Sequence, residues 1–165
     1  MNGPLSHHDF DTLRRLMPGL VLFARQRCRN AEDVVQDSLM KLFQMPQSPE
    51  NVAAWLYQVI RRNAINSVRS ESRRNRHEQI AAETRQPWFE ASPENSLEIE
   101  MLSKALKSQP VEFREVIVAR IWGGLTFDQI GDLVGTSSRT ASRKYQEGLT
   151  LLRMQLKVNN ELEKE

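Results

Sequence analysis

Apolar residues recur along most of this chain at steps of three and four, the period of an α-helix that buries one face. The first such stripe lies between positions 10 and 24 and consists of Phe10, Leu13, Leu16, Met17, Leu20 and Ala24. No stretch alternates strictly between apolar and polar residues, as a half-buried β-strand does. We therefore predict an all-α protein.

Helix-start signals divide the N-terminal part of the chain into three helices. Ser6 begins a capping-box pattern for the first helix, which Pro18 is expected to kink or divide. Asn30 is a suitable cap for the second helix, whose inward side chains are expected to be Val35, Leu39, Leu42 and Phe43. Ser48 followed by Pro49 predicts the start of the third helix. The apolar face of that helix comprises Val52, Leu56, Val59, Ile60, Ile65 and Val68.

After the third helix the apolar periodicity fades, while prolines and charged residues become frequent. This change predicts two small helical domains joined by a linker, with a first domain over residues 1–72, the linker over 73–96 and a second domain over 97–160. The linker contains two adjacent large aromatic residues, Trp88 and Phe89, which are costly to expose to water. They can dock either on the protein's own helices or on a partner.

The second domain carries the spacing of a helix-turn-helix motif. A helix is expected from Val111 to Trp122, and the glycines that follow should end it. Thr126 and Gln129 then form a capping box for a short helix. Within this motif Gly131 is small where two helices must cross closely, and Gly135 marks the turn.

The helix after this turn, which Ser137 can cap, has two faces of different character. Its inward face consists of Ala141, Tyr145, Leu149, Leu152 and Leu156. Its outward face begins with Arg139, Ser142, Arg143 and Gln146. A recognition helix presents basic and polar side chains of this kind to the major groove of DNA. A helical hairpin without a DNA role would share the inward pattern, so the outward arginines are what favour DNA binding.

Charged residues are segregated along the chain, although 23 Lys and Arg against 21 Asp and Glu leave a net charge of only +2. Residues 61–76 carry a net charge of +5, residues 78–100 carry −5 and residues 137–157 carry +4. Clustered arginines are typical of a nucleic-acid-binding surface. Two solvated helix faces would give the same charge pattern.

The remaining composition excludes several classes of protein. The single cysteine, Cys28, can form neither an internal disulfide nor a zinc site. The longest apolar stretch near the start runs from Leu16 to Ala24, is interrupted by Pro18 and Gly19, and is too short to span a membrane. It also lacks the flanking features of a secretion signal. We expect a cytoplasmic protein with no membrane insertion, no cofactor and no bound metal.

Four segments of the chain form patterns in a fixed order. In the first domain they are AEDVVQDSL from Ala31 to Leu39 and AWLYQVIRRNAIN from Ala54 to Asn66. In the second domain they are VIVAR from Val116 to Arg120 and GLTFDQIG from Gly124 to Gly131. Together they resemble regions 2 and 4 of the extracytoplasmic-function group of sigma-70 family RNA polymerase sigma factors. Within these segments Asn66 replaces an acidic residue that the family usually has, and Gly131 stands where alanine is common.

The resemblance implies a transcription initiation factor that is not an enzyme. The partners that it implies are core RNA polymerase and promoter DNA, and it leaves open an anti-sigma factor. It assigns polymerase binding to Glu32, Asp33, Gln36 and Asp37. It assigns the −10 promoter element to Arg61, Arg62, Asn63, Asn66 and Arg69, and the −35 element to Ser138, Arg139, Thr140, Ser142, Arg143 and Lys144. Trp55 is expected in the core rather than as a base-stacking residue.

Other functions need features that this sequence lacks. A stand-alone helix-turn-helix repressor would need a dimer interface or a ligand-binding domain, and the N-terminal part suggests neither. A metal-dependent enzyme would have to use Glu32, Asp33 and Asp37, which lie on one predicted helix without a nearby histidine, phosphate loop or nucleophile. A protein that only binds other proteins would not need outward Arg139 and Arg143, and salt-sensitive DNA binding would distinguish it.

Overall fold

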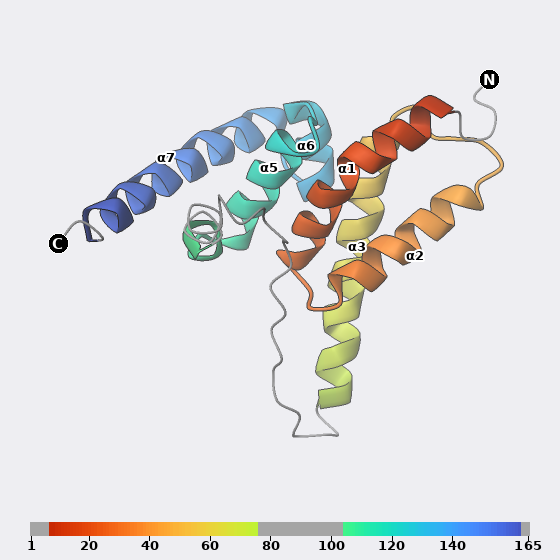
Figure 1. Cartoon of the computed structure of the whole chain (residues 1–165), viewed down its shortest axis with the longest axis horizontal. Helices are drawn as coiled ribbons and strands as arrows, with labels where there is room; N and C mark the ends of the chain where they lie inside the picture. Colours follow the sequence, from red (N-terminus) through yellow and green to blue (C-terminus); the bar gives the residue numbers. More distant parts are fainter. Residues whose placement is uncertain (1–6, 76–103, 163–165) are drawn as a thin grey trace.

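The computed structural model describes residues 7–75 and 104–162, which fold predominantly into α-helices (Figure 1). The main helices are α1 (His7–Arg25), α2 (Ala31–Phe43), α3 (Val52–Asn75), α5 (Val111–Ile121), α6 (Phe127–Val134) and α7 (Ser138–Leu162). These two ranges contain no β-strand, and the predicted all-α fold is confirmed. The expected cap at Ser6 and the aromatic pair of the linker lie outside the described residues.

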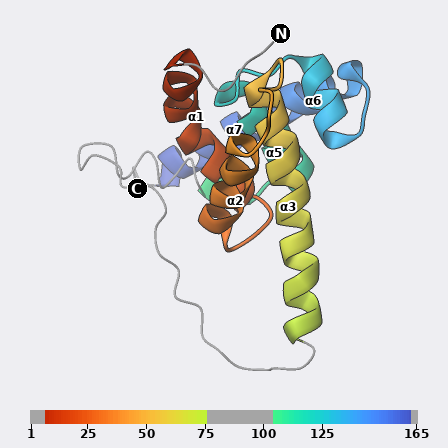
Figure 2. The same cartoon turned by 90° about the vertical axis from the view of Figure 1, so that its right-hand side faces the viewer.

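The N-terminal half, residues 7–75, is a bundle in which α1, α2 and α3 pack against one another (Figures 1 and 2). Leu20, Leu56 and Ile60 are completely buried at its centre. Phe23 of α1 meets Tyr57 of α3 edge to face, with ring centroids 4.8 Å apart, which is a favoured geometry for aromatic pairs. These contacts hold α1 on α3.

The helix starts of this half differ from the expectation at two asparagines. Asn30 occupies the N-cap position of α2, but its side chain makes no capping hydrogen bond and its Oδ1 instead accepts one from Ser67 Oγ at 2.7 Å. The start of α3 is capped by Asn51, whose Oδ1 accepts a hydrogen bond from the Ala54 N–H at 2.9 Å. Asn30 thus joins the start of α2 to α3, whereas Asn51 caps the start of α3.

The lengths of two helices also depart from the expectation. α1 is a single helix through Pro18, which therefore does not divide it. α3 begins at Val52 rather than directly after Pro49, and it continues to Asn75, a short way past the predicted domain boundary.

Two phenylalanines expected on inward faces lie at the surface. Phe10 of α1 and Phe43 of α2 are each 49% exposed, and their rings stack with centroids 6.1 Å apart. Met40 is exposed on α2 one turn before Phe43. Trp55, by contrast, is partly buried and packs against the core, as predicted.

The C-terminal half, residues 104–162, contains the predicted helix-turn-helix. The capping box of α6 is complete, because the Gln129 N–H donates to Thr126 Oγ1 and the Thr126 N–H donates to Gln129 Oε1. A side chain at Gly131 would place its Cβ 2.7 Å from the Thr136 carbonyl oxygen, so the turn requires glycine there. Gly135 ends α6 with a φ of 73°, which a residue with a side chain rarely adopts.

The two halves pack directly against each other, with α1 contacting α5 and α3 contacting α6 (Figure 2). A Cβ at Gly19 of α1 would lie 2.7 Å from Trp122 Cβ, and a Cβ at Gly123 would lie 2.8 Å from the Tyr57 ring. Glycine at both positions therefore permits a close approach of the halves. None of the helices that the structure describes has the length and hydrophobicity of a membrane-spanning segment.

Candidate functional site

The exposed face of α2 is acidic and polar. Asp33, Gln36 and Asp37 are exposed there, while the opposite face of the helix is buried against α1 and α3. Glu32 is also exposed and forms an ion pair with Arg25 at the end of α1. The four residues predicted to bind the polymerase thus share the solvent side of one helix. Toward its C-terminal end this face becomes apolar, at the exposed side chains of Met40 and Phe43, the latter stacked on Phe10 of α1.

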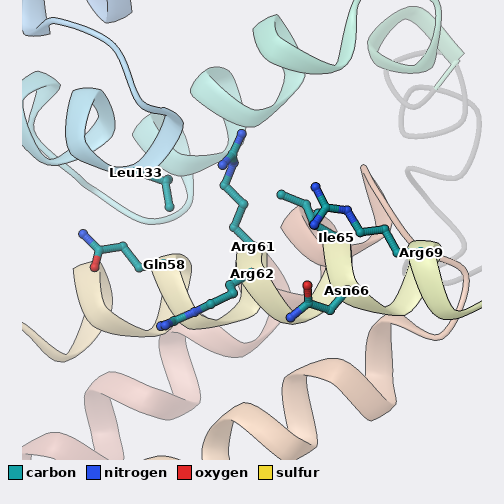
Figure 3. Close-up of a pocket in the computed structure, with 7 residues that line it drawn as sticks. All are labelled: Gln58, Arg61, Arg62, Ile65, Asn66, Arg69 and Leu133. Carbon is teal, nitrogen blue, oxygen red and sulfur yellow. The ribbon is translucent and has the colours of Figure 1, made fainter.

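The solvent-facing side of α3 is basic. Arg62, Asn66 and Arg69 are exposed on it, and Arg61 is half-buried. These residues line an open cleft between α3 and α6 together with Gln58, Ile65 and Leu133 (Figure 3). Figure 3 shows Arg61 extending from α3 toward the ribbon of the C-terminal half, whereas Arg62 remains beside α3. The structure therefore gathers Arg61, Arg62, Asn66 and Arg69 at one cleft.

Asn63 is held differently from its basic neighbours on α3. Its Nδ2 donates a hydrogen bond to Ser38 Oγ at 3.0 Å, and its Oδ1 accepts one from Lys41 Nζ at 3.2 Å. Both partners belong to α2. The amide therefore links the acidic helix to the basic helix, and one of its N–H groups is left for another partner.

The first turns of α7 carry the residues predicted to contact the −35 element. Arg139 is exposed, Arg143 is exposed beside Glu147, and Ser138, Thr140, Ser142 and Lys144 are half-buried. The Arg143 and Glu147 side chains approach to 3.8 Å, a solvated pair that contributes little to stability. As predicted, Ser137 caps the helix, because its hydroxyl accepts a hydrogen bond from the Thr140 N–H at 3.1 Å. On the opposite side Ala141 is fully buried.

Arg120 is a structural residue of the helix-turn-helix that the sequence pattern did not reveal. Its guanidinium lies 4.7 Å from the centroid of the Phe127 ring and donates to the Leu125 carbonyl at 2.6 Å. The Phe127 ring in turn contacts Tyr145 of α7, with centroids 5.6 Å apart. A cation over an aromatic face is attracted by the ring, so Arg120 helps to hold α6 on α5, while the Phe127–Tyr145 contact joins α6 to α7.

Glu115 of α5 is the second important residue that the sequence pattern did not reveal. It is 1% exposed, and its carboxylate pairs with Arg27 and Arg61 of the N-terminal half. The hydrogen bond to Glu115 raises the pKa of the Arg27 guanidinium, against the lowering effect of desolvation. The available sequence signal was a lone acidic residue next to the apolar run Val116–Ala119.

The described residues contain no group of three His, Cys, Asp or Glu side chains that could hold a metal ion. The carboxylates of Glu32, Asp33 and Asp37 point to solvent on one helix and are not gathered around a cavity. What the structure presents are therefore surfaces: an acidic one on α2, and basic ones on α3 and α7.

Comparison with known proteins shows the fold and the family of the N-terminal half. Residues 12–74 match the family model described as sigma-70 region 2. Residues 12–74 therefore form a region 2 of the sigma-70 type. This match agrees with the resemblance of the motifs in the first domain to sigma-70 family sigma factors. The match covers α2, which carries the acidic surface, and all but the last residue of α3, which carries one of the two basic surfaces.

Two similar proteins extend the similarity to most of this chain. It is 24% identical over 130 residues to the RNA polymerase sigma factor SigV of Bacillus subtilis, an alignment that covers 77% of this chain and 76% of SigV. Its fold is similar to that of the sigma factor RpoE of Bartonella quintana, solved in complex with the anti-sigma factor NepR. That comparison has a TM-score of 0.67 and 23% identity, and it covers 93% of this chain and 99% of RpoE. Sigma factors are regulators of transcription rather than enzymes.

Proposed function

We propose that this sigma factor binds core RNA polymerase through α2 and directs it to promoters through α3 and α7. The observation that carries the proposal is the separation of charge among these three helices. Acidic side chains occupy the exposed face of α2, whereas α3 and the start of α7 expose arginines. A chain with one acidic and two basic surfaces is suited to bridge a protein and two sites on DNA.

Polymerase binding is assigned to Glu32, Asp33, Gln36 and Asp37. Carboxylates repel the phosphates of DNA, so an acidic surface favours a basic surface on a protein partner. Next to these residues lie the exposed side chains of Met40 and Phe43, the latter stacked on Phe10. Apolar side chains adjacent to complementary charges are the usual composition of a protein–protein interface.

Recognition of the −10 element is assigned to Arg61, Arg62, Asn63, Asn66 and Arg69. Arginines can hold the phosphates of the strand, while Asn66 can donate and accept hydrogen bonds at a base edge. Four of these five residues border one open cleft. Asn63 lies on the side of α3 that faces α2, where it donates one N–H to Ser38. Its other N–H is the group that we assign to DNA.

Recognition of the −35 element is assigned to Ser138, Arg139, Thr140, Ser142, Arg143 and Lys144. These residues occupy the first two turns of the second helix of a helix-turn-helix, the part that enters the major groove in DNA-binding proteins of this type. Arg139 and Arg143 are exposed and lie one helical turn apart, so both can reach the same groove.

An anti-sigma factor is a further partner in this proposal. The solved sigma factor RpoE, which shares this fold over most of the chain, was crystallised with such a protein. An inhibitor that binds both halves while they pack together would keep the three proposed surfaces from acting on one promoter.

The experiment is transcription by core polymerase with and without the purified sigma factor, followed by sequencing of the RNA 5′ ends. We expect new start sites that share one pair of upstream elements. We also expect little sequence-specific DNA binding by the free protein. Tight, specific binding by the free chain without any effect on core polymerase would refute the proposal and indicate a repressor.

A further inference from the structure

Glu147 is an acidic side chain within a basic segment of α7. It is the only Asp or Glu between residues 137 and 157, a segment that contains five basic residues. It lies one helical turn after Arg143, and both side chains are exposed. A carboxylate repels the phosphates of DNA, so at this position it lowers nonspecific affinity for DNA. Glu147 therefore has a role other than general attraction to DNA.

Helix stability does not account for this glutamate. An ion pair four residues apart stabilises a helix best when the acidic residue comes first, and here Arg143 precedes Glu147. The side chains are 69% and 53% exposed, so solvent screens the attraction between them. α7 begins at Ser138, and Glu147 therefore lies beyond the first turn, where the helix dipole would favour a carboxylate.

The ion pair with Glu147 constrains which edge of the Arg143 guanidinium faces outward. Arg143 Nε lies 3.8 Å from Glu147 Oε1, so the carboxylate approaches the Nε side of the guanidinium. The N–H groups that Nη1 and Nη2 direct away from the side chain stay available to another partner. Two parallel donors of this kind match the O6 and N7 acceptors that guanine presents in the major groove.

Arg139 differs from Arg143, although both are exposed on the outward side of α7. Arg139 forms no ion pair with any residue that the structure describes. An arginine without a fixed orientation can follow a phosphate, whereas a bidentate contact to a base requires one defined orientation. The structure thus distinguishes two arginines that the sequence pattern treats alike.

We propose that Glu147 positions Arg143 so that this arginine reads a guanine in the −35 element. The inference rests on the proposed role of α7 in −35 recognition. The carboxylate restricts the Arg143 side chain before DNA arrives, so less conformational entropy is lost when the base is bound. It also repels phosphates, which favours the contact with a base edge over a contact with the backbone. Glu147 therefore increases specificity rather than affinity.

Run-off transcription by core polymerase with the full chain measures base specificity. The templates carry each of the four bases at every position of the −35 element that maps upstream of the wild-type start sites. We expect the wild type to prefer guanine at one position, and Arg143→Ala to weaken this preference on the order of tenfold. Glu147→Gln should weaken the same preference about threefold and leave the other positions unchanged. Glu112→Gln, an equal change of charge at an exposed position of α5, is the control and should match the wild type.

A double-mutant cycle tests whether Glu147 acts through Arg143. In the Arg143→Ala background, Glu147→Gln should have no further effect on the guanine preference, because no guanidinium remains to be positioned. A carboxylate that contacted DNA itself would accept a hydrogen bond from N4 of cytosine. A cytosine preference that Glu147→Gln removes in both backgrounds would therefore overturn the inference.

The outcomes also separate this inference from the proposed function. If Arg143→Ala changes specificity at a position where guanine is not preferred, or if Glu147→Gln leaves the guanine preference intact, the inference is refuted while −35 recognition by α7 stands. If neither Arg139→Ala nor Arg143→Ala alters transcription from any template, the proposed function of α7 fails, and the positioning role of Glu147 fails with it.

Discussion

Asn63 of α3 donates a hydrogen bond to the completely buried hydroxyl of Ser38 of α2, with 3.0 Å between the amide nitrogen and the oxygen. The Ser38 hydroxyl itself donates to the Val34 carbonyl at 2.7 Å. This chain of hydrogen bonds fixes the helix that carries the proposed polymerase surface against the helix that carries the proposed −10 surface. Asn63 therefore combines a structural role with its proposed contact to DNA.

Alanine substitutions at the two positions separate these roles. We expect Asn63→Ala and Ser38→Ala each to lower the free energy of unfolding by about 1 kcal/mol, because either removes the same buried hydrogen bond. Only Asn63→Ala should also reduce initiation at promoters, since Ser38 is inaccessible to DNA. Urea unfolding and run-off transcription measure the two effects. Equal transcription by the two variants would show that Asn63 only positions α3.

Asp37→Lys tests the acidic surface of α2. Asp37 is exposed, so we expect the free energy of unfolding to change by no more than about 0.5 kcal/mol. Affinity for core polymerase should fall, because the charge reversal opposes a basic partner surface. Asp11→Lys, an equal charge reversal at an exposed position of α1, serves as the control. The prediction fails if both variants compete equally well for core polymerase.

Arg139→Ala and Arg143→Ala test the start of α7. Replacing an arginine that reads a base should cost about 1 to 3 kcal/mol of promoter-binding free energy and relax specificity at one −35 position. Replacing an arginine that contacts a phosphate should weaken binding to all promoters alike and lower the slope of the salt dependence by roughly one. Run-off transcription from a panel of −35 variants at two salt concentrations distinguishes these results. Arg153→Ala, an exposed arginine farther along α7, should behave as wild type.

If Arg139→Ala and Arg143→Ala both match the wild type across that panel, α7 does not read the −35 element. In that case the helix-turn-helix would be a purely structural unit, and the proposed assignment of its outward face would be wrong.

Gly131→Ala tests the turn of the helix-turn-helix. The added methyl group would meet the Thr136 carbonyl oxygen at 2.7 Å, so the backbone must shift. We expect a loss of about 1 to 3 kcal/mol in the free energy of unfolding. Asp132→Ala, at the next and exposed position of α6, should cause little change. Thermal or urea unfolding of the two variants provides the comparison, and equal stability would contradict the close helix–turn contact.

Cys28 predicts a specific pH dependence of stability. Burial, with a smaller effect of the Glu71 charge, raises the pKa of the Cys28 thiol from 9.0 to about 11. In the unfolded chain the thiol ionises first, so its contribution to stability is complete below about pH 9 and is lost as the pH rises toward 11. Cys28→Ala should therefore lose less stability than the wild type between these pH values. If urea unfolding shows that the wild type and Cys28→Ala lose stability equally over this pH range, a buried and protonated Cys28 thiol is refuted.

The sequence alone determined those features that depend on neighbours within one or two helical turns. The capping box of Thr126 and Gln129, the cap at Ser137 and the glycine turn at Gly135 were all predicted and are all present. Each rests on hydrogen bonds or backbone angles within a few residues, where the order of residue types is sufficient. The helical period of the apolar residues, for the same reason, predicted the all-α fold.

Only the tertiary structure decided which side chains meet across the molecule. Phe43 follows the inward period of α2, yet none of the helices that the structure describes buries it, and it is half exposed beside Phe10. Arg27 and Arg61 are separated from Glu115 by 88 and 54 positions in the chain. No local pattern encodes such pairs, because their meeting depends on how α1 and α3 pack against α5. The sequence could thus predict the charged surfaces, while the packing of the two halves determined that Arg27 and Arg61 pair with the buried Glu115.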